Sequence, residues 1–496
     1  MMRKTTSLKP LRLIKATQDH KEGFDEVEDD EQPLSPGARL FHEPGANVYI
    51  IIILGMKTQI NTDVFKANIP DSICKNHRFS SLQVLDKENG KMKWVPTHVE
   101  LDNHVIVPKF DPDTESGDKF VEDYISNLSK SHIDNSKPLW DLHILNTKTL
   151  NAQGTCIFRI HHSIGDGMSL VNLLLACSRK ASDPEALPTL PGDNKLGRKI
   201  KLVTSFRYLF MVIWNAIVAL VVFILTVLFP KDTKTLLSGY PGIEDRPRRF
   251  VFTSVSFDDI KLVKKAMDVK VNDVVLGVIK AGLYRYLNRR YGAKENNNNH
   301  VPENTRLRAT LFFNMRPSTM IEVRVASTLE SYMAFNTDAT RRPGAWGNKV
   351  SYVLLSFDMK HKQDLLDYVR EVKTDMERKK ASLEPLYTAI IINLVIKLFG
   401  VKFAGKLNHK VFSNTTVALS NVPGPQEHIS LYGHQVNYIA SSCYGQPMAL
   451  MISVVSYVDK MTFVVSADEE IIPDPQSLCH ELQASLQLMK SSISNV

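Results

Sequence analysis

Two adjacent histidines, His161 and His162, begin a short polar run in the stretch RIHHSIGDGMSL, residues 159–170. An imidazole gains and loses a proton near neutral pH, so a histidine can act as a general base. Asp166 follows four residues after His162, and Gly167 comes directly after it. The pattern indicates proton-transfer chemistry, in which one histidine takes a proton from a substrate hydroxyl while that oxygen attacks an acyl carbon.

Two other interpretations fit the same residues. One is a turn in which both histidines are only hydrogen-bonded. The other is a metal site built on His162 and Asp166, but such a site needs a third ligand, and the chain has no HExxH run or histidine-rich partner. A serine nucleophile is not indicated, because no GxSxG stretch accompanies the histidines. General base catalysis without a metal is therefore favoured.

A strand and a helix are predicted to hold this run in place. The strand is TCIFRI, residues 155–160, and the helix is MSLVNLLLAC, residues 168–177. Successive side chains of a strand point to opposite faces, so His161 and His162 cannot both face one cleft; one works and the other supports it. Asp166 can cap the helix and fix the loop, a role that an Asp166→Asn change would largely keep.

The rest of the chain alternates strands with helices, which predicts two α/β halves. Strands are predicted in NVYIIIILGM (47–56), RRFVFTSVSF (248–257), ATLFFNM (309–315), VALSNV (417–422), ALMISVVSYV (449–458) and MTFVVSA (461–467). A helix is predicted over residues 272–292, with Asn272 as its N-cap and Gly292 as its C-terminal stop.

Composition limits the classes of function. The chain has 496 residues, 43% of them hydrophobic, enough for a large core divided between two halves. Its net charge of +8 is spread along the chain without a basic block, which disfavours a nucleic-acid partner and favours an anionic membrane surface. Five cysteines without CxxC spacing indicate reduced thiols facing the cytosol. Residues 1–32 are charged and read as a disordered leader, not a signal peptide.

The run LFMVIWNAIVALVVFILTVLF, residues 209–229, has no charged side chain. As a helix it would be about 31 Å long, which matches a bilayer core. A buried core helix is the alternative, but only Asn215 and Thr226 interrupt the apolar surface. Because a simple crossing would separate the two halves, we expect a membrane-embedded element that does not cross. The alternative is that it pairs with a second span at residues 386–405, which are apolar enough to reach the interface but contain Lys397 and Lys402.

Several motifs of this chain carry a family resemblance. HHSIGDG (161–167) matches the HHxxxDG motif of the HxxxD acyltransferase superfamily, and further stretches resemble its plant-type wax ester synthase/diacylglycerol acyltransferases. These stretches are PLSPGARLFH (33–42), PLWD (138–141), VNDVVLG (271–277), FNMRP (313–317), GN (347–348) and SNVPGP (420–425). The DFGWG stretch of the soluble plant acyltransferases is absent from the sequence. The resemblance runs from about residue 33 to the C-terminus.

The resemblance implies two chloramphenicol-acetyltransferase-like sandwich domains with an active-site channel between them. By match, His162 is the base, Asp166 orients its loop, and His161 and Gly167 support it. Binding residues at the domain interface and along the channel are implied by match in the VNDVVLG and SNVPGP stretches: Asn272, Asp273, Asn421, Pro423 and Gly424. As alternatives that carry no function, Asn272 and Asp273 are a helix cap and SNVPGP is an ordinary turn.

The resemblance also implies the reaction and its setting. The substrates are acyl-CoA and a long-chain alcohol, giving a wax ester, with diacylglycerol as a second acceptor; no cofactor or metal is needed. The setting is the endoplasmic reticulum membrane with the active site facing the cytosol, or the plasma membrane. Two alternatives remain: a condensation-type acyltransferase with another acyl donor, and an inactive membrane-tethered binding protein. The expected division is a leader (1–32), an N-terminal half (33–190), a linker with the apolar helix (191–245) and a C-terminal half (246–496).

Overall fold

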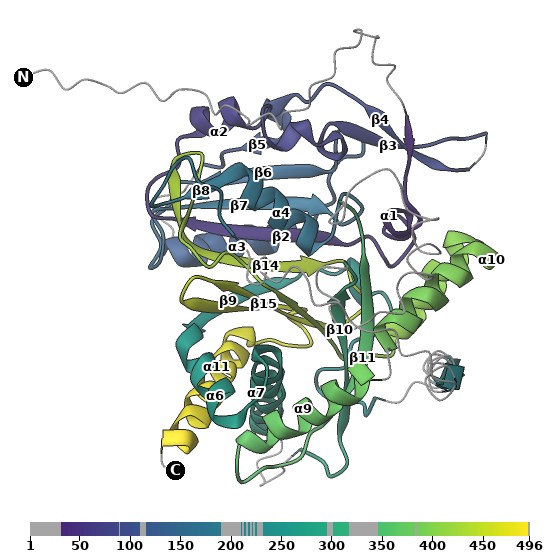
Figure 1. Cartoon of the computed structure of the whole chain (residues 1–496), viewed down its shortest axis with the longest axis vertical. Helices are drawn as coiled ribbons and strands as arrows, with labels where there is room; N and C mark the ends of the chain where they lie inside the picture. Colours follow the sequence, from purple (N-terminus) through teal and green to yellow (C-terminus); the bar gives the residue numbers. More distant parts are fainter. Residues whose placement is uncertain are drawn as a thin grey trace, which may run out of the picture.

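The computed structural model describes residues 31–88, 90–109, 116–189, 232–294, 301–316, 346–381 and 384–494, with eight further positions between 210 and 225. Within them the chain forms two halves, each a mixed β-sheet with helices against it (Figure 1). The expected α/β class with two sandwich-like halves is confirmed. The leader up to residue 30 and most of the apolar run at 209–229 lie outside the described residues.

The larger sheet belongs mainly to the N-terminal half and has seven strands in the order β5-β6-β7-β2-β14-β13-β8. Its strands are β2 (Tyr49–Met56), β5 (Val105–Ile106), β6 (Trp140–Leu145), β7 (Gly154–His161), β8 (Ser178–Lys180), β13 (Ile429–Leu431) and β14 (His434–Tyr444). The helices of this half are α1 (Pro36–Leu40), α2 (Thr62–Asn68), α3 (Gly117–Leu128) and α4 (Gly167–Cys177). A small sheet of order β1-β4-β3 lies beside it: β1 (Gln32–Pro33), β3 (Ser81–Leu85) and β4 (Met92–Pro96).

The second sheet has six strands in the order β11-β10-β12-β15-β16-β9. They are β9 (Arg249–Ser256), β10 (Arg306–Asn314), β11 (Val350–Asp358), β12 (Val417–Val422), β15 (Leu450–Tyr457) and β16 (Lys460–Ala467). Its helices are α6 (Phe257–Met267), α7 (Val271–Lys294), α9 (Leu366–Ala381), α10 (Glu384–Ser413) and α11 (Pro475–Ser494). The strands predicted from the sequence are all present, because their β-branched runs suit the buried positions of both sheets.

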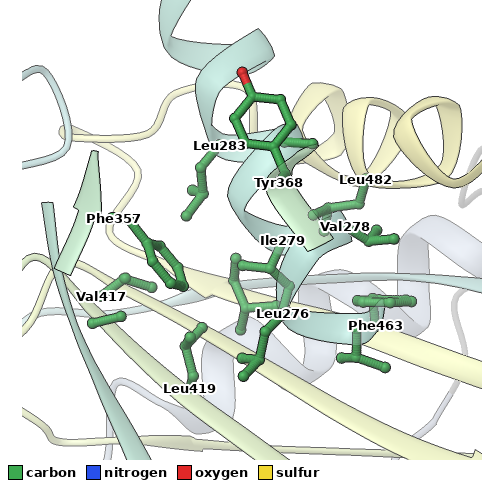
Figure 2. Close-up of a cluster of buried hydrophobic side chains, with 14 of the residues drawn as sticks. Leu276, Val278, Ile279, Leu283, Phe357, Tyr368, Val417, Leu419, Phe463 and Leu482 are labelled. Carbon is green, nitrogen blue, oxygen red and sulfur yellow. The ribbon is translucent and has the colours of Figure 1, made fainter. Parts of the chain in front are cut away.

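The core of the C-terminal half forms around α7, which α6, α9 and α11 contact (Figure 2). Leu276, Ile279 and Leu283 of α7 are buried against strand residues such as Leu419 and Phe463. Nearly all of the helix between Asp273 and Leu287 is buried, which explains why its apolar residues are not confined to one stripe.

The strand β14 joins the two halves. It follows β12 of the C-terminal sheet along the chain, yet it pairs with β2 of the N-terminal sheet, antiparallel, from Val436 opposite Met56 to Tyr444 opposite Tyr49. It also contacts β15 and β16 of the other sheet, and Figure 1 shows it between β2 and β15. A segment far along the chain therefore completes the sheet that carries the two histidines.

The predicted ends of α7 are wrong by one or two residues. The helix begins at Val271, so Asn272 lies inside it and is not the N-cap. Instead, Asp273 Oδ2 accepts a hydrogen bond from the backbone N–H of Lys270 at 2.9 Å, the backward bond of a capping box. At the other end the helix continues past Gly292 to Lys294.

Among the described residues, α10 is the one helix long and apolar enough, by length and composition alone, to cross a membrane. Figure 1 shows it reaching outward on the side of the molecule where α1 lies, and α1 contacts it. The eight described positions between 210 and 225 are helical, and all of them are exposed apolar side chains.

Candidate active site

A buried ion pair fixes the strand that leads to the two histidines. Arg159 on β7 donates to Asp141 on β6 through Nη2 at 2.6 Å and through Nε at 3.0 Å. Burial alone would raise the pKa of Asp141, but the bonds from His143 and Arg159 outweigh burial and lower it to about 2. Asp141 is the last residue of the PLWD stretch, so that stretch holds β6 and β7 together just before the histidines.

His161 is the last residue of β7, and its ring is fully engaged. Its Nδ1 lies 2.6 Å from Ser163 Oγ and its Nε2 lies 2.9 Å from Asn47 Oδ1. Only 1% of the residue is exposed, and burial, followed by the nearby His42 and His162, holds its pKa well below the usual value. With both nitrogens bonded, His161 has no free site for a substrate proton, so its geometry is that of a supporting residue.

His162 follows directly and is partly exposed, and only one of its two ring nitrogens is bonded by a described residue. Its Nδ1 lies 3.1 Å from Asn348 Oδ1, while Asn348 Nδ2 donates to the backbone oxygen of His162 at 2.9 Å. The ring of Phe41 stacks on the imidazole with centroids 4.1 Å apart and planes 14° from parallel. No described residue bonds Nε2 of His162.

These contacts select one tautomer of His162. Because the Asn348 amide nitrogen donates to a carbonyl, its oxygen must face Nδ1, and Nδ1 must carry the hydrogen. Nε2 then presents a lone pair. Burial lowers the pKa of His162, against smaller raising effects from Asp166 and from the Asn348 bond. The imidazole is therefore neutral and ready to accept a proton at neutral pH.

Asp166 holds the loop and makes no bond to the His162 ring. It is the N-cap of α4, accepting from the backbone N–H of Ser169 at 2.9 Å. Its other oxygen, Oδ2, accepts from Arg316 Nη1 and from the backbone N–H of Lys349, both at 2.9 Å. Both carboxylate oxygens are thus occupied by protein donors, which leaves a metal site shared with His162 without geometric support. No cluster of metal-binding side chains is found among the described residues.

Residues of the C-terminal half complete this loop. Arg316 also donates to Ser169 Oγ at 2.8 Å and to the backbone oxygen of Gly347 at 2.9 Å. Trp346 Nε1 donates to the backbone oxygen of Ile164 at 2.5 Å. The histidine loop is therefore clamped by a segment that follows it by about 180 residues in the chain.

The glycines of the motif differ in their packing. A Cβ at Gly165 would lie 3.0 Å from Trp346 Nε1 and 3.1 Å from Ser169 Cβ, so a side chain there would push against the clamp. Gly167, the first residue of α4, has ordinary space, because its Cβ would lie 3.4 Å from Val422. The geometry thus explains a glycine at 165 more directly than at 167.

The predicted binding residues lie at the start of α7, near the end of β12 and in the turn directly after β12. Asn421 Nδ2 donates to Asn272 Oδ1 at 3.0 Å, which joins the two motifs. Asp273 is engaged at the start of α7 and Pro423 is exposed. Gly424 allows a close approach, since a Cβ there would lie 2.1 Å from the backbone oxygen of Ser456. None of these five residues bonds the His162 ring, so their binding role stays a prediction.

Sequence reasoning missed several residues that touch or hold the site, among them Phe41, Arg316 and Asn348. Phe41, Arg316 and Asn348 lie in the stretches PLSPGARLFH, FNMRP and GN, which carried the resemblance without an assigned role. Phenylalanine, arginine and asparagine are not typical proton acceptors, so their residue types gave no sign of a role in proton transfer. Only the fold, which brings residues 41, 316 and 348 to residue 162, reveals them.

The two sheets and the histidine loop between them define a protein of the chloramphenicol-acetyltransferase-like fold class. Among solved structures, a wax ester synthase/diacylglycerol acyltransferase from Marinobacter aquaeolei VT8 has a TM-score of 0.59 at 18% identity and covers 93% of this chain and 100% of its own. The first condensation domain of the CDA synthetase has a TM-score of 0.55 at 12% identity, with 94% and 97% covered. These likenesses concern the fold.

Sequence comparison specifies the family. The wax ester synthase/diacylglycerol acyltransferase catalytic domain matches residues 77–275, and the corresponding C-terminal domain matches residues 346–490. Wax ester synthase/diacylglycerol acyltransferase 2 of Arabidopsis thaliana is 40% identical over 476 residues, covering 94% of this chain and 97% of its own. Wax ester synthase/diacylglycerol acyltransferase 5 of the same plant is 41% identical, and the match covers 94% of this chain and 94% of that protein. The chain belongs to the wax ester synthase/diacylglycerol acyltransferase family, a family of acyltransferase enzymes.

Proposed function

We propose that this protein transfers a fatty acyl group from acyl-CoA to the hydroxyl of a long-chain alcohol, forming a wax ester, and to that of diacylglycerol, forming triacylglycerol. The observation that carries the proposal is the state of His162. Its Nδ1 is fixed by Asn348, and among the described residues nothing bonds its Nε2. Family membership supplies the substrate classes through the names of the relatives.

In the proposed reaction, His162 Nε2 takes the proton of the acceptor hydroxyl as the oxygen attacks the thioester carbon. The carbonyl becomes a tetrahedral oxyanion. When the oxyanion collapses, the carbon–sulfur bond breaks, and the imidazolium gives its proton to the departing CoA sulfur. The ester and CoA thiol leave, and His162 is again neutral. Positioned base catalysis of this kind contributes about 10²–10⁴-fold.

The remaining residues act on the loop and the substrates. Asp166 and Arg316 hold the loop, while His161 supports the strand end beside His162. We assign substrate binding to Asn272, Asp273, Asn421, Pro423 and Gly424, along a channel between the halves. The Asn272–Asn421 bond brings the VNDVVLG and SNVPGP stretches together within the C-terminal half, as a shared binding surface requires. No cofactor or metal enters the proposed steps.

We place the reaction at the endoplasmic reticulum membrane with the active site on the cytosolic side, and take the plasma membrane as the alternative. Support comes from α10 and from the exposed apolar positions between 210 and 225. All five cysteines are free thiols, which fits a reducing compartment. The apolar linker run at 209–229 is proposed to enter the bilayer without crossing it, because a crossing would divide the two halves.

The experiment is incubation of microsomes containing the full chain with labelled acyl-CoA and, in separate reactions, hexadecanol or diacylglycerol. Labelled wax ester, with or without triacylglycerol, is the expected result. Ester formation only from a carrier-bound acyl group would favour a condensation-type enzyme. No ester from any acceptor, with the protein folded and membrane-bound, would favour a binding protein without activity.

A further inference from the structure

The helix α10 carries an apolar segment that the rest of the protein does not cover. Its middle part, residues 393–403, exposes the side chains of Leu394, Leu398, Phe399 and Phe403, with Leu398 and Phe399 64% and 63% exposed, while Val401 among them is buried. Phe399 and Phe403 pack on each other with ring centroids 5.1 Å apart. We call residues 393–403 the α10 arm. Isolated exposed apolar residues are common, but a cluster on one projecting element marks a docking surface.

Both ends of α10 are attached to the body. Leu386 and Tyr387 are buried at its start, and Ala404 and Val411 are buried after the arm. At Gly400 the helical geometry is lost, with φ 81° and ψ 169°, a conformation that essentially only glycine adopts. The stretch from Glu384 up to this break spans about 24 Å as a helix, less than a bilayer core. The chain thus leaves the body and returns to it, so the arm can enter a surface but cannot cross it.

The charge of α10 indicates what kind of surface it fits. After Glu384 the helix contains no acidic residue, whereas it carries Lys397, Lys402, Lys406 and Lys410. All four lysines are exposed. Exposed apolar side chains flanked by lysines on one element are typical of a segment that binds the headgroup region of an anionic bilayer. A partner protein with an apolar groove would not require this one-sided positive charge.

The part of α10 that follows the arm lies against the segment that covers the base. A Cβ at Gly405 would lie 2.9 Å from the side chain of Glu43, and a side chain at Gly45 would overlap the ring of His409. Two residues before Glu43, Phe41 stacks on His162. The helix α1 and the turn after it therefore lie between α10 and the imidazole of His162, and they contact both.

We propose that the α10 arm docks into the interfacial region of an anionic bilayer and thereby places the acceptor side of the His162 site at the membrane surface. The proposal rests on the proposed function, since it concerns how a lipid-soluble alcohol reaches that site. In this arrangement a long-chain alcohol moves from the bilayer to His162 along the α1–α10 contact, while acyl-CoA arrives from water. The arm is distinct from the linker run at 209–229 and acts without it.

The direct test is a depth measurement on the full-length chain. An environment-sensitive NBD label is attached at Leu398→Cys and, as the matched control, at Leu150→Cys, an 86% exposed residue of the N-terminal half. The unsubstituted chain, labelled in parallel, corrects for its own cysteines. With phosphatidylcholine–phosphatidylserine vesicles carrying brominated acyl chains, the label at 398 should be quenched and the label at 150 should not. Equal quenching at both positions, or none at 398, would overturn the proposal.

A functional test separates docking from chemistry. The variant Leu398→Glu/Phe399→Glu should lower turnover of hexadecanol embedded in vesicles by at least about tenfold, while turnover of a short water-soluble alcohol changes little. An equal loss with both alcohols would contradict a docking role. If the arm instead joins two copies of the chain, the wild type will be a dimer and this variant a monomer in light scattering, without quenching at 398. If the wild type esterifies neither alcohol, the proposed function fails, while quenching still reports on docking.

Discussion

The Asp166→Asn substitution tests the clamp around the histidine loop. Asp166 and Arg316 form an ion pair at 2.9 Å, and their side chains are only 1% and 3% exposed. The substituted side chain would keep one oxygen to accept from Ser169, so the cap of α4 should survive. Its amide nitrogen, however, would face two donors, Arg316 Nη1 and the backbone N–H of Lys349. A buried guanidinium would lose its counter-charge.

The expected cost follows from these contacts. Removing one partner of a buried ion pair costs about 3–5 kcal/mol, compared with about 1 kcal/mol for the loss of a helix cap. We therefore expect Asp166→Asn to lower the free energy of unfolding by about 3–5 kcal/mol. Activity should fall as well, because the loop that carries His162 loses its tie to the C-terminal half. The sequence alone predicts that Asn at position 166 largely keeps the capping and loop-fixing role of Asp166, so the structure predicts a larger loss than the sequence does.

The assay is thermal and denaturant unfolding of a double-mutant cycle with Asp166→Asn, Arg316→Met and both together. Because either single change breaks the same pair, the double variant should cost little more than one single variant. The control is Asp71→Asn, whose partner Lys75 forms a solvent-exposed pair and which should cost less than about 1 kcal/mol. Additive single effects, or an Asp166→Asn protein as stable as the wild type, would refute the reasoning.

Three further predictions concern His162 and the SNVPGP loop. The acid limb of the kcat/KM profile should lie below pH 6.5, because burial lowers the pKa of His162 and only the neutral imidazole accepts a proton. An acid limb above pH 6.5 would contradict this prediction. Asn348→Ala removes the acceptor of the Nδ1 hydrogen, a bond that raises the pKa of His162, so the acid limb should move to lower pH and kcat should fall by about tenfold. An unchanged pH profile would mean that Asn348 has only a structural role. Gly424→Ala should destabilise by about 1–3 kcal/mol in thermal melts, since its Cβ would overlap Ser456 O, while Pro423→Ala at the exposed neighbour should be near neutral.

Local patterns predicted the strands, α7 and the strand–loop–helix unit of the histidines, because hydrophobic periodicity and burial agree there. They also predicted two chemically different histidines, and the structure shows His161 bonded at both nitrogens. The pairing of Asp166 with Arg316, 150 positions away, has no local signal. The N-cap of α7 was misplaced because Asn272 resembles a cap by residue type, whereas its side chain accepts a bond from Asn421 and Asp273 makes the capping bond.

The α10 helix shows a different limit of sequence reasoning. Its composition predicts contact with a membrane, but not the geometry of that contact. Only the fold shows that residues on both sides of the arm are buried in the body and that Gly400 interrupts the helix between them. An apolar helix that enters a bilayer and returns to the protein body can have the same amino-acid composition as a helix that crosses the bilayer.

The central claim, that His162 is the base of an acyl transfer, is tested most directly by comparing His162→Ala with His161→Ala in the same membranes, with labelled acyl-CoA and hexadecanol at saturating concentration. The account predicts that His162→Ala lowers turnover by about 10²–10⁴-fold with only a small drop in melting temperature, from the lost Asn348 bond and Phe41 stacking. His161→Ala should keep more activity and lose stability instead, because Ser163 and Asn47 lose a buried partner. Turnover of the His162→Ala protein close to that of the wild type, or a larger loss of turnover in His161→Ala, would contradict the assignment of the base.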